Sequence, residues 1–167
     1  MESQIEDLEY LTIVNNILNN DEFKKLKNIE HHGMTRYDHS VRVSYYSYKV
    51  AKALHLNYVE TARGGLLHDF FISKEDRTNL ERFTSTFTHP KLALKTTQAN
   101  FDITKREADM IRSHMFPINI SVPKYAESWI VSSVDKFVAT SEFSMKVEFR
   151  MKYAYNVMLI FLFSFMR

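Results

Sequence analysis

The sequence contains no cysteine, and only three glycines and three prolines in 167 residues. The absence of cysteine excludes disulfides, thiolate metal sites and cysteine nucleophiles, and it suits a reducing compartment. The scarcity of glycine and proline leaves few turn signals, which argues against an all-β fold with many short connections. We therefore expect an all-α protein, folded as a single-domain helical bundle.

Strong charge of one sign is also missing. The formal net charge is +2, and Lys and Arg are spread along the chain without a run of five or six. This pattern predicts no specific nucleic-acid partner. The first ten residues, MESQIEDLEY, are acidic and lack the basic and then apolar pattern of a secretory signal, so we expect a cytoplasmic location.

One long apolar run stands near the C-terminus, at residues 154–166 (AYNVMLIFLFSFM). It is shorter than the roughly 17–25 residues that a membrane-spanning helix needs, so we expect no membrane span. A buried C-terminal helix is one interpretation. The alternative is a hydrophobic face for a second subunit, as in a homodimer, or for a membrane surface, with flanking charges at Arg150, Lys152 and Arg167.

Apolar periodicity and capping residues predict the helices. Apolar residues at steps of three and four indicate a first helix over residues 5–18. Thr35 can cap a long helix that runs to about Leu56. Two further pairs, Asn57 with Glu60 and Thr104 with Glu107, have the spacing of a capping box.

The segment 73–88 (SKEDRTNLERFTSTFT) has no apolar period and predicts a loop. A helix is expected to begin at Thr88-His89-Pro90, because proline is tolerated in a first turn. Ser121 and Pro123 open the last clear helix, whose apolar stripe runs beside Asp135.

Two of the three glycines stand in the stretch ARGGLLHDFF, residues 62–71. Gly64 and Gly65 lie four residues before His68 and Asp69, so the helix surface below this polar pair is bare and another helix can approach it closely. The alternative is that the glycines only weaken the helix, by about 1 kcal/mol each relative to alanine. A carboxylate in so apolar a stretch needs a partner or a metal if it is buried.

Two other polar residues lie on apolar helix faces. His39 shares its column with Val43, and Asp135 stands between Val131 and Val138. A carboxylate on an apolar helix face between valines needs a nearby cation to stabilise its charged form. His39, His68, Asp69 and Asp135 would supply two imidazoles and two carboxylates, a set that suits Fe, Mn, Co, Ni or Zn.

His89 and His114 could hold a second ion, with a carboxylate bridging the pair at roughly 3.5–4 Å. Each histidine alone is more often structural than a ligand. The aromatic stretch SYYSY at residues 44–48 could stack on a base, although tyrosines within a helix more often belong to a core.

The order His39, His68-Asp69, His89, His114, Asp135 resembles the HD-domain metal-dependent phosphohydrolase superfamily in its six-ligand form, H…HD…H…H…D. The flanking residues are similar as well. Residues 36–40 (RYDHS) match the family pattern R-x-x-H-S, and residues 64–69 (GGLLHD) match its pattern of a small residue followed by L-L-H-D. Residues 133–136 (SVDK) resemble the helix that carries the family's last aspartate. The resemblance covers about residues 31–140.

This resemblance implies a helical bundle of the HD-domain type. Residues 1–30 would form an N-terminal scaffold, 31–145 the metal-binding core and 146–167 an apolar C-terminal helix, all in one domain. His39, His68, Asp69 and Asp135 would bind one divalent transition-metal ion, and Asp69 would bridge to a second ion held by His89 and His114. Small bacterial diadenosine-tetraphosphate hydrolases are similar in size and ligand order, which implies a small phosphorylated substrate, a nucleotide.

The implied activity is hydrolysis of a phosphoester or phosphoanhydride by a metal-bridging hydroxide, with Asp69 placing the ions. Many relatives carry a lysine three residues after the doublet, where this chain has Ile72 and then Lys74 two residues further on. Arg36 is the alternative phosphate clamp, unless it is a solvated surface residue. Two other interpretations stay open: a metal- and nucleotide-binding sensor without turnover, and a purely structural metal.

Overall fold

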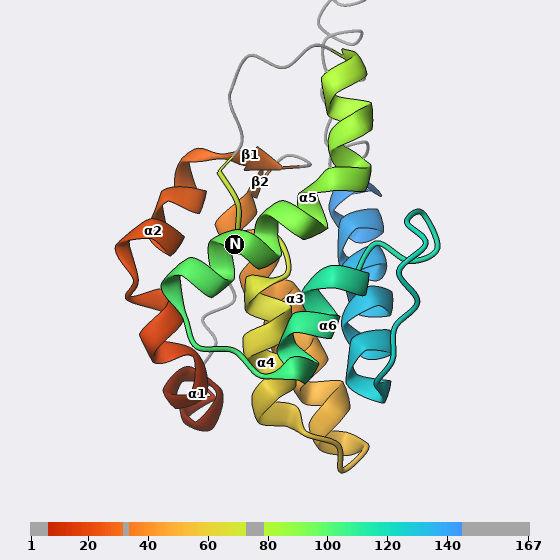
Figure 1. Ribbon diagram of the computed structural model, residues 1–167. Coiled ribbons are helices and arrows are strands. Elements are labelled where there is room, and N and C mark those ends of the chain that lie inside the picture. The colour runs from red at the N-terminus through yellow and green to blue at the C-terminus, as the bar shows by residue number, and fades with distance from the viewer. Residues whose placement is uncertain (1–6, 32–33, 73–78, 145–167) are drawn as a thin grey trace, which may run out of the picture.

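The computed structural model describes residues 7–31, 34–72 and 79–144, and this part of the chain is an all-α bundle, as predicted (Figure 1). Its only sheet is a short antiparallel hairpin in which Glu30 pairs with Thr35 and His31 with Met34. The elements are α1 (Leu8–Leu18), α2 (Asp21–Lys24), the 3₁₀ helix η1 (Lys25–Asn28), β1 (Glu30–His31), β2 (Met34–Thr35), α3 (Arg36–Ala53), α4 (Tyr58–Leu67), α5 (Asn79–Asn100), α6 (Lys105–Ser113) and a helix over residues 126–144.

Side-chain caps begin three of these helices where the sequence predicts them. The Thr35 hydroxyl accepts a hydrogen bond from the Asp38 amide at 3.1 Å, and Thr104 and Glu107 form a complete capping box. The Asn57 side chain caps α4 by accepting a hydrogen bond from the Glu60 amide. The predicted return bond, from the Asn57 amide to the Glu60 carboxylate, is wrong. The Asn57 amide donates instead to Glu127 at 3.1 Å, which ties the start of α4 to the 126–144 helix.

The predicted loop over residues 73–88 is wrong from Asn79 onward, where α5 begins. Pro90 therefore lies inside a helix and does not open one. A proline within a helix removes one backbone hydrogen bond and bends the axis. Figure 1 shows such a bend, with the lime and green parts of α5 running in different directions.

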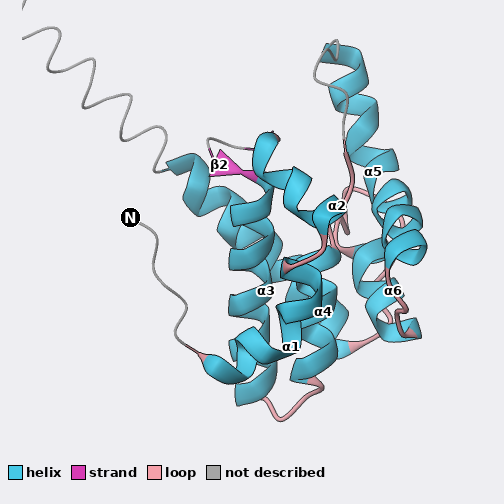
Figure 2. Ribbon diagram, turned by 90° about the vertical axis from the view of Figure 1, so that its left-hand side faces the viewer, coloured by secondary structure: helices cyan, strands magenta, loops and turns pink. Residues whose placement is uncertain are grey.

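The bundle is organised around α3 and α4, which pack against each other along their lengths. Helix α4 also contacts α1 on one side and α6 on the other, and α5 packs on α6. Figure 2 shows α1, α3 and α4 side by side. The main core lies between these helices and contains buried apolar side chains from most of the chain: Tyr10, Val14, Ile17, Phe23, Leu26, Tyr48, Ala62, Leu66, Leu67, Phe70, Phe71, Ala93 and Ile111.

The glycine pair permits this packing, as the sequence predicts. A Cβ on Gly65 would lie 3.0 Å from the Cα of Ser44, in the backbone of α3. A Cβ on Gly64 would lie 2.4 Å from the sulfur of Met110, in α6. Helix α4 is therefore held close to both neighbours at the turn that precedes His68 and Asp69.

None of the helices within the described ranges is long and apolar enough to cross a membrane. The apolar segment predicted at 146–167 lies outside the described residues.

Candidate metal centre

The six predicted ligands come from different helices and meet inside the bundle. His39 lies in the first half of α3, His68 and Asp69 follow the last residue of α4, and His114 follows the last residue of α6. The remaining two lie within helices, His89 in α5 and Asp135 in the 126–144 helix. His39, His68 and His114 are at most 1 % exposed, so the imidazoles are withdrawn from solvent.

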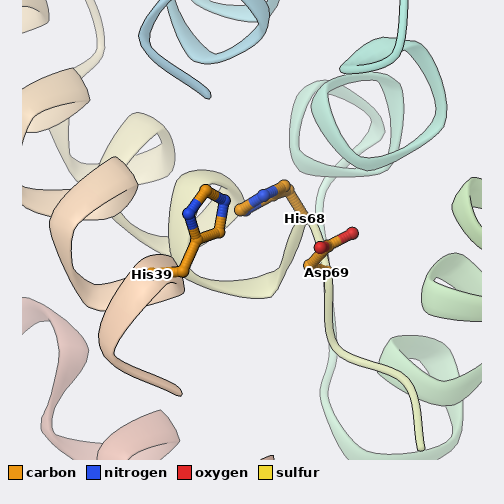
Figure 3. Close-up of side chains that lie close together, drawn as sticks. All are labelled: His39, His68 and Asp69. Carbon is orange, nitrogen blue, oxygen red and sulfur yellow. The ribbon is translucent and has the colours of Figure 1, made fainter. Parts of the chain in front are cut away.

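One side of the cluster joins α3, the end of α4 and the 126–144 helix. The Oδ1 atom of Asp135 lies 3.1 Å from Nε2 of His39 and 3.5 Å from Nε2 of His68. Figure 3 shows the two imidazole rings side by side and tilted, with Asp69 on the far side of His68 from His39.

The other side joins the end of α4, α5 and the end of α6. The Nε2 atoms of His89 and His114 are 2.9 Å apart. The Oδ1 atom of Asp69 lies 3.4 Å from Nε2 of His89 and 3.6 Å from Nε2 of His114. Asp69 therefore connects the two sides of the cluster.

The donor atoms have the spacing of ligands to a common cation. Among the described residues, three overlapping groups each place their donor atoms within 4.8 Å of one another, and together they use all six residues. They are His39, His68 and Asp69; His68, His114 and Asp135; and Asp69, His89 and His114. Two donors about 2.1 Å from one ion are roughly 3.0–3.4 Å apart at ordinary bond angles, so the separations of 2.9–3.6 Å fit a divalent metal ion.

Hydrogen bonds to the other ring nitrogen direct Nε2 of each buried imidazole toward the cluster. Nδ1 of His68 donates to the Gly65 carbonyl and Nδ1 of His114 donates to the Ile111 carbonyl, both at 2.8 Å. A carbonyl only accepts, so Nδ1 carries the proton and Nε2 keeps its lone pair when the ring is neutral. Nε2 of His68 is buried and makes no hydrogen bond of good geometry within the described residues, as expected of an atom that serves a metal.

The pKa values reflect burial and the two carboxylates. Burial, with nearby His68, lowers the pKa of His114 to about 4, so this ligand is neutral at pH 7. Burial opposes a charge on His39, but hydrogen bonds to Asp135 and Glu142 outweigh it and raise the pKa of His39 to about 10. Burial likewise opposes the charge on Asp135, yet the hydrogen bond from His39 and the nearby His68 imidazole hold its pKa well below the usual range. Without a metal, the charge of His39 compensates that of Asp135.

A small buried apolar cluster lies one helical turn from several of the donors. It contains Val43, Met110, Val131 and Val138, all at most 2 % exposed. Each lies one helical turn from a donor on its own element: Val43 from His39, Met110 from His114, and both Val131 and Val138 from Asp135. Buried apolar neighbours lower the local dielectric, which strengthens interactions between donors and a cation.

Arg36 lies beside the cluster and is not a solvated surface residue, since it is only 7 % exposed. Its Nη1 donates to the Phe71 carbonyl at 2.7 Å, and its guanidinium lies 4.0 Å from the centre of the Phe71 ring. The same ring stacks on His89 with an interplanar angle of 25°. Phe71 thus links Arg36 to a predicted ligand, whereas Lys74 lies outside the described residues.

The aromatic stretch at residues 44–48 divides between core and surface. Tyr48 is fully buried, with its ring 5.4 Å from that of Tyr10 and 5.6 Å from that of Tyr58, as expected of a core residue. Tyr46 is half exposed.

Three residues at the site were not predicted. Glu142 accepts a hydrogen bond from Nδ1 of His39 at 3.0 Å, and Ser132 and Lys136 both donate to the His114 carbonyl at 2.8 Å. A signal existed for Glu142, because it stands seven residues after Asp135 and therefore on the same helix face. The contacts of Ser132 and Lys136 with another helix leave no trace in the local sequence pattern.

Comparison with known proteins gives one match. The family model described as HD domain matches residues 36–140, which include all six residues of the cluster. No curated protein and no solved structure matches the chain. Because the model covers more than half of the sequence, the chain belongs to the HD-domain family.

Proposed function

We propose that this HD-domain protein is a binuclear metal-dependent phosphohydrolase that cleaves a phosphoester or phosphoanhydride bond of a nucleotide. The family suggests metal-dependent phosphohydrolase activity, and the His/Asp clusters fit divalent metal binding. The observation that carries the proposal is the convergence of four imidazoles and two carboxylates on one buried point. Buried carboxylates destabilise a fold unless a cation compensates their charge. A purely structural role therefore explains this set of residues less well than a metal site does.

The proposed ligands divide between two ions. His39, His68 and Asp135 would hold one ion and His89 and His114 the other, with Asp69 contacting both, since it belongs to a donor group on each side. Four nitrogens and two carboxylates suit Fe, Mn, Co, Ni or Zn better than Mg or Ca. Bound ions of this kind acidify water and neutralise charge on phosphoryl oxygens.

Arg36 is proposed to bind the phosphate of the substrate. Its contacts with the carbonyl and the ring of Phe71 hold the guanidinium against a residue that itself stacks on His89. A guanidinium that is fixed in advance binds an anion with little loss of side-chain freedom. Lys74 is the second proposed phosphate contact, on the strength of the resemblance to relatives that carry a lysine near this position.

The substrate class is a nucleotide with a polyphosphate chain, such as a dinucleoside tetraphosphate. Similarity in size and ligand order to small bacterial diadenosine-tetraphosphate hydrolases supports this choice. Two bound ions and the buried Arg36 would together supply positive charge toward several adjacent phosphates.

Metal-stripped protein reloaded separately with Mn, Fe, Co, Ni or Zn tests the proposal against bis-p-nitrophenyl phosphate, ATP and diadenosine tetraphosphate. We expect metal-dependent hydrolysis that is lost in Asp69→Asn and His114→Ala and kept in His55→Ala, whose histidine is exposed. Chromatography of the products identifies the bond that breaks. Tight nucleotide binding without any product after long incubation would refute the hydrolase and favour a sensor. Unfolding on metal removal without any turnover would favour a structural metal.

A further inference from the structure

Glu142 lies outside the six-residue cluster but contacts one of its members. It is 3 % exposed, in the last turn of the described part of the 126–144 helix. Its Oε2 atom accepts the Nδ1 proton of His39 at 3.0 Å, while Asp135 on the same helix lies 3.1 Å from Nε2 of His39. One helix therefore holds both nitrogens of this imidazole, from positions two turns apart.

The other carboxylate oxygen of Glu142 shows that His39 is its principal partner. Oε1 is buried and makes no hydrogen bond within the described residues, and its ion pair with Nη1 of Arg42 is long, at 4.0 Å. A buried carboxylate held by one hydrogen bond and one long ion pair is a poor way to stabilise a fold, because an apolar side chain of similar volume usually serves at least as well. We therefore look for the function of the Glu142 carboxylate in its hydrogen bond to His39.

His39 differs in this respect from the other two fully buried histidines. His68 and His114 donate Nδ1–H to backbone carbonyls, which fix the tautomer but carry no net charge. Nδ1–H of His39 donates to a carboxylate. This bond fixes the tautomer and also makes Nε2 a stronger electron-pair donor to a metal ion. Glu142 is not itself among the grouped donor atoms of the described residues, because it lies across the His39 ring from them.

We propose that Glu142 is a positioning residue for the metal centre: it holds Nδ1–H of His39, selects Nε2 as the ligating atom and strengthens its bond to a divalent cation. This inference rests on the proposed metal centre. Glu142 adds a charged partner to one side of that centre only. Loss of Glu142 should therefore weaken the binding of the ion that His39 holds.

Metal affinity of the full chain tests the proposal through a readout that does not depend on turnover. Glu142→Ala and Glu142→Gln are compared with the wild type in competition of Co²⁺ and Zn²⁺ against a chromophoric chelator. Glu127→Gln is the matched control, because Glu127 is a buried glutamate on the same helix whose partners are the Asn57 amide at the start of α4 and Arg106. Circular dichroism of each metal-free variant establishes that it is folded.

We expect Glu142→Ala to weaken the binding of one ion roughly 10- to 100-fold, as loss of an outer hydrogen-bond partner does at other metal sites. Glu142→Gln loses less, since its amide oxygen still accepts the Nδ1 proton, and both variants shift the visible absorption bands of bound Co²⁺. Glu127→Gln changes neither. If Glu142→Ala does not fold, the metal affinity and the Co²⁺ absorption spectrum of Glu142→Gln alone test the proposal.

Two results would overturn the inference: Glu142 variants that bind metal within twofold of the wild type with an unchanged Co²⁺ spectrum, or a control that loses as much affinity as they do. Wild-type protein that binds no metal at all is a different outcome. It removes the proposed centre itself, and with it the role of Glu142.

Discussion

The close approach of α4 to α3 at Gly65 makes the substitution Gly65→Ala a sensitive test of how the site is built. An alanine Cβ would lie 3.0 Å from the Cα of Ser44 and 3.5 Å from its amide nitrogen, both backbone atoms of α3. Backbone in a packed helix cannot turn aside as a side chain can, so the two helices must separate by a few tenths of an ångström. Overpacking of this kind costs about 1–3 kcal/mol.

Alanine also gains about 1 kcal/mol over glycine in helix propensity, so the net destabilisation by Gly65→Ala is about 0–2 kcal/mol. Gly64→Ala is the matched control. Its Cβ would come closer to a neighbour, 2.4 Å from the sulfur and 3.3 Å from the Cβ of Met110, but the sulfur, the closer atom, belongs to a flexible side chain that can change rotamer. We therefore expect Gly65→Ala to be the less stable variant by about 1 kcal/mol, although the closer contact is at Gly64.

Thermal unfolding of the metal-free proteins, followed by circular dichroism, measures the difference. For a chain of this size about 1 kcal/mol corresponds to roughly 2–4 °C in Tm. Gly65→Ala should also weaken metal binding more than Gly64→Ala, because the Gly65 carbonyl accepts the Nδ1 proton of His68 and moves with α4. A Gly65→Ala protein that is more stable than the wild type, or than Gly64→Ala, would refute this account of the packing.

Three further predictions concern single side chains. His114→Ala should abolish binding of one divalent ion while His55→Ala leaves the stoichiometry unchanged, as measured by equilibrium dialysis; equal stoichiometry in both would contradict the ligand assignment. Arg36→Met should raise KM for a phosphorylated substrate by roughly 10- to 100-fold, the worth of a charge-assisted hydrogen bond, with metal affinity unchanged; a loss confined to kcat would exclude a phosphate-binding role. Burial raises the pKa of Tyr10 above its ordinary value of 10, so the wild type should lose stability as pH rises past 10, where the unfolded chain ionises first. Tyr10→Phe should be about 1 kcal/mol less stable at pH 7, from the lost 2.9 Å bond to Ser44, yet decline less steeply in denaturant titrations between pH 10 and 11; parallel curves would contradict the assignment.

The elements predictable from the sequence are those set by local rules. Thr35 and the pair Thr104–Glu107 cap their helices because a side chain three residues from an amide reaches it whatever surrounds it. The bare surface beside Gly64 and Gly65 likewise follows from composition alone. Local rules also indicated an all-α bundle, since so few residues were available to make turns.

The remaining features depend on contacts between distant segments. The Asn57 amide had a local acceptor in Glu60, but Glu127 from another helix takes it. The first half of α5 has a polar, threonine-rich sequence of modest helix propensity, and Pro90 suggested a beginning where the helix in fact continues. Glu142 was missed for a related reason, because its position seven residues after Asp135 becomes meaningful only once His39 is known to lie between the two carboxylates.

Four histidines and two aspartates are proposed to hold divalent ions inside the bundle. An anomalous difference map, from crystals of protein loaded with Mn²⁺ or Zn²⁺ and measured on both sides of the absorption edge, tests this proposal most directly. We expect two peaks about 3.5–4 Å apart, both near Asp69, one beside His39 and one between His89 and His114. Peaks only at exposed residues such as His55, or a cluster that holds no ion at saturating metal, would contradict it.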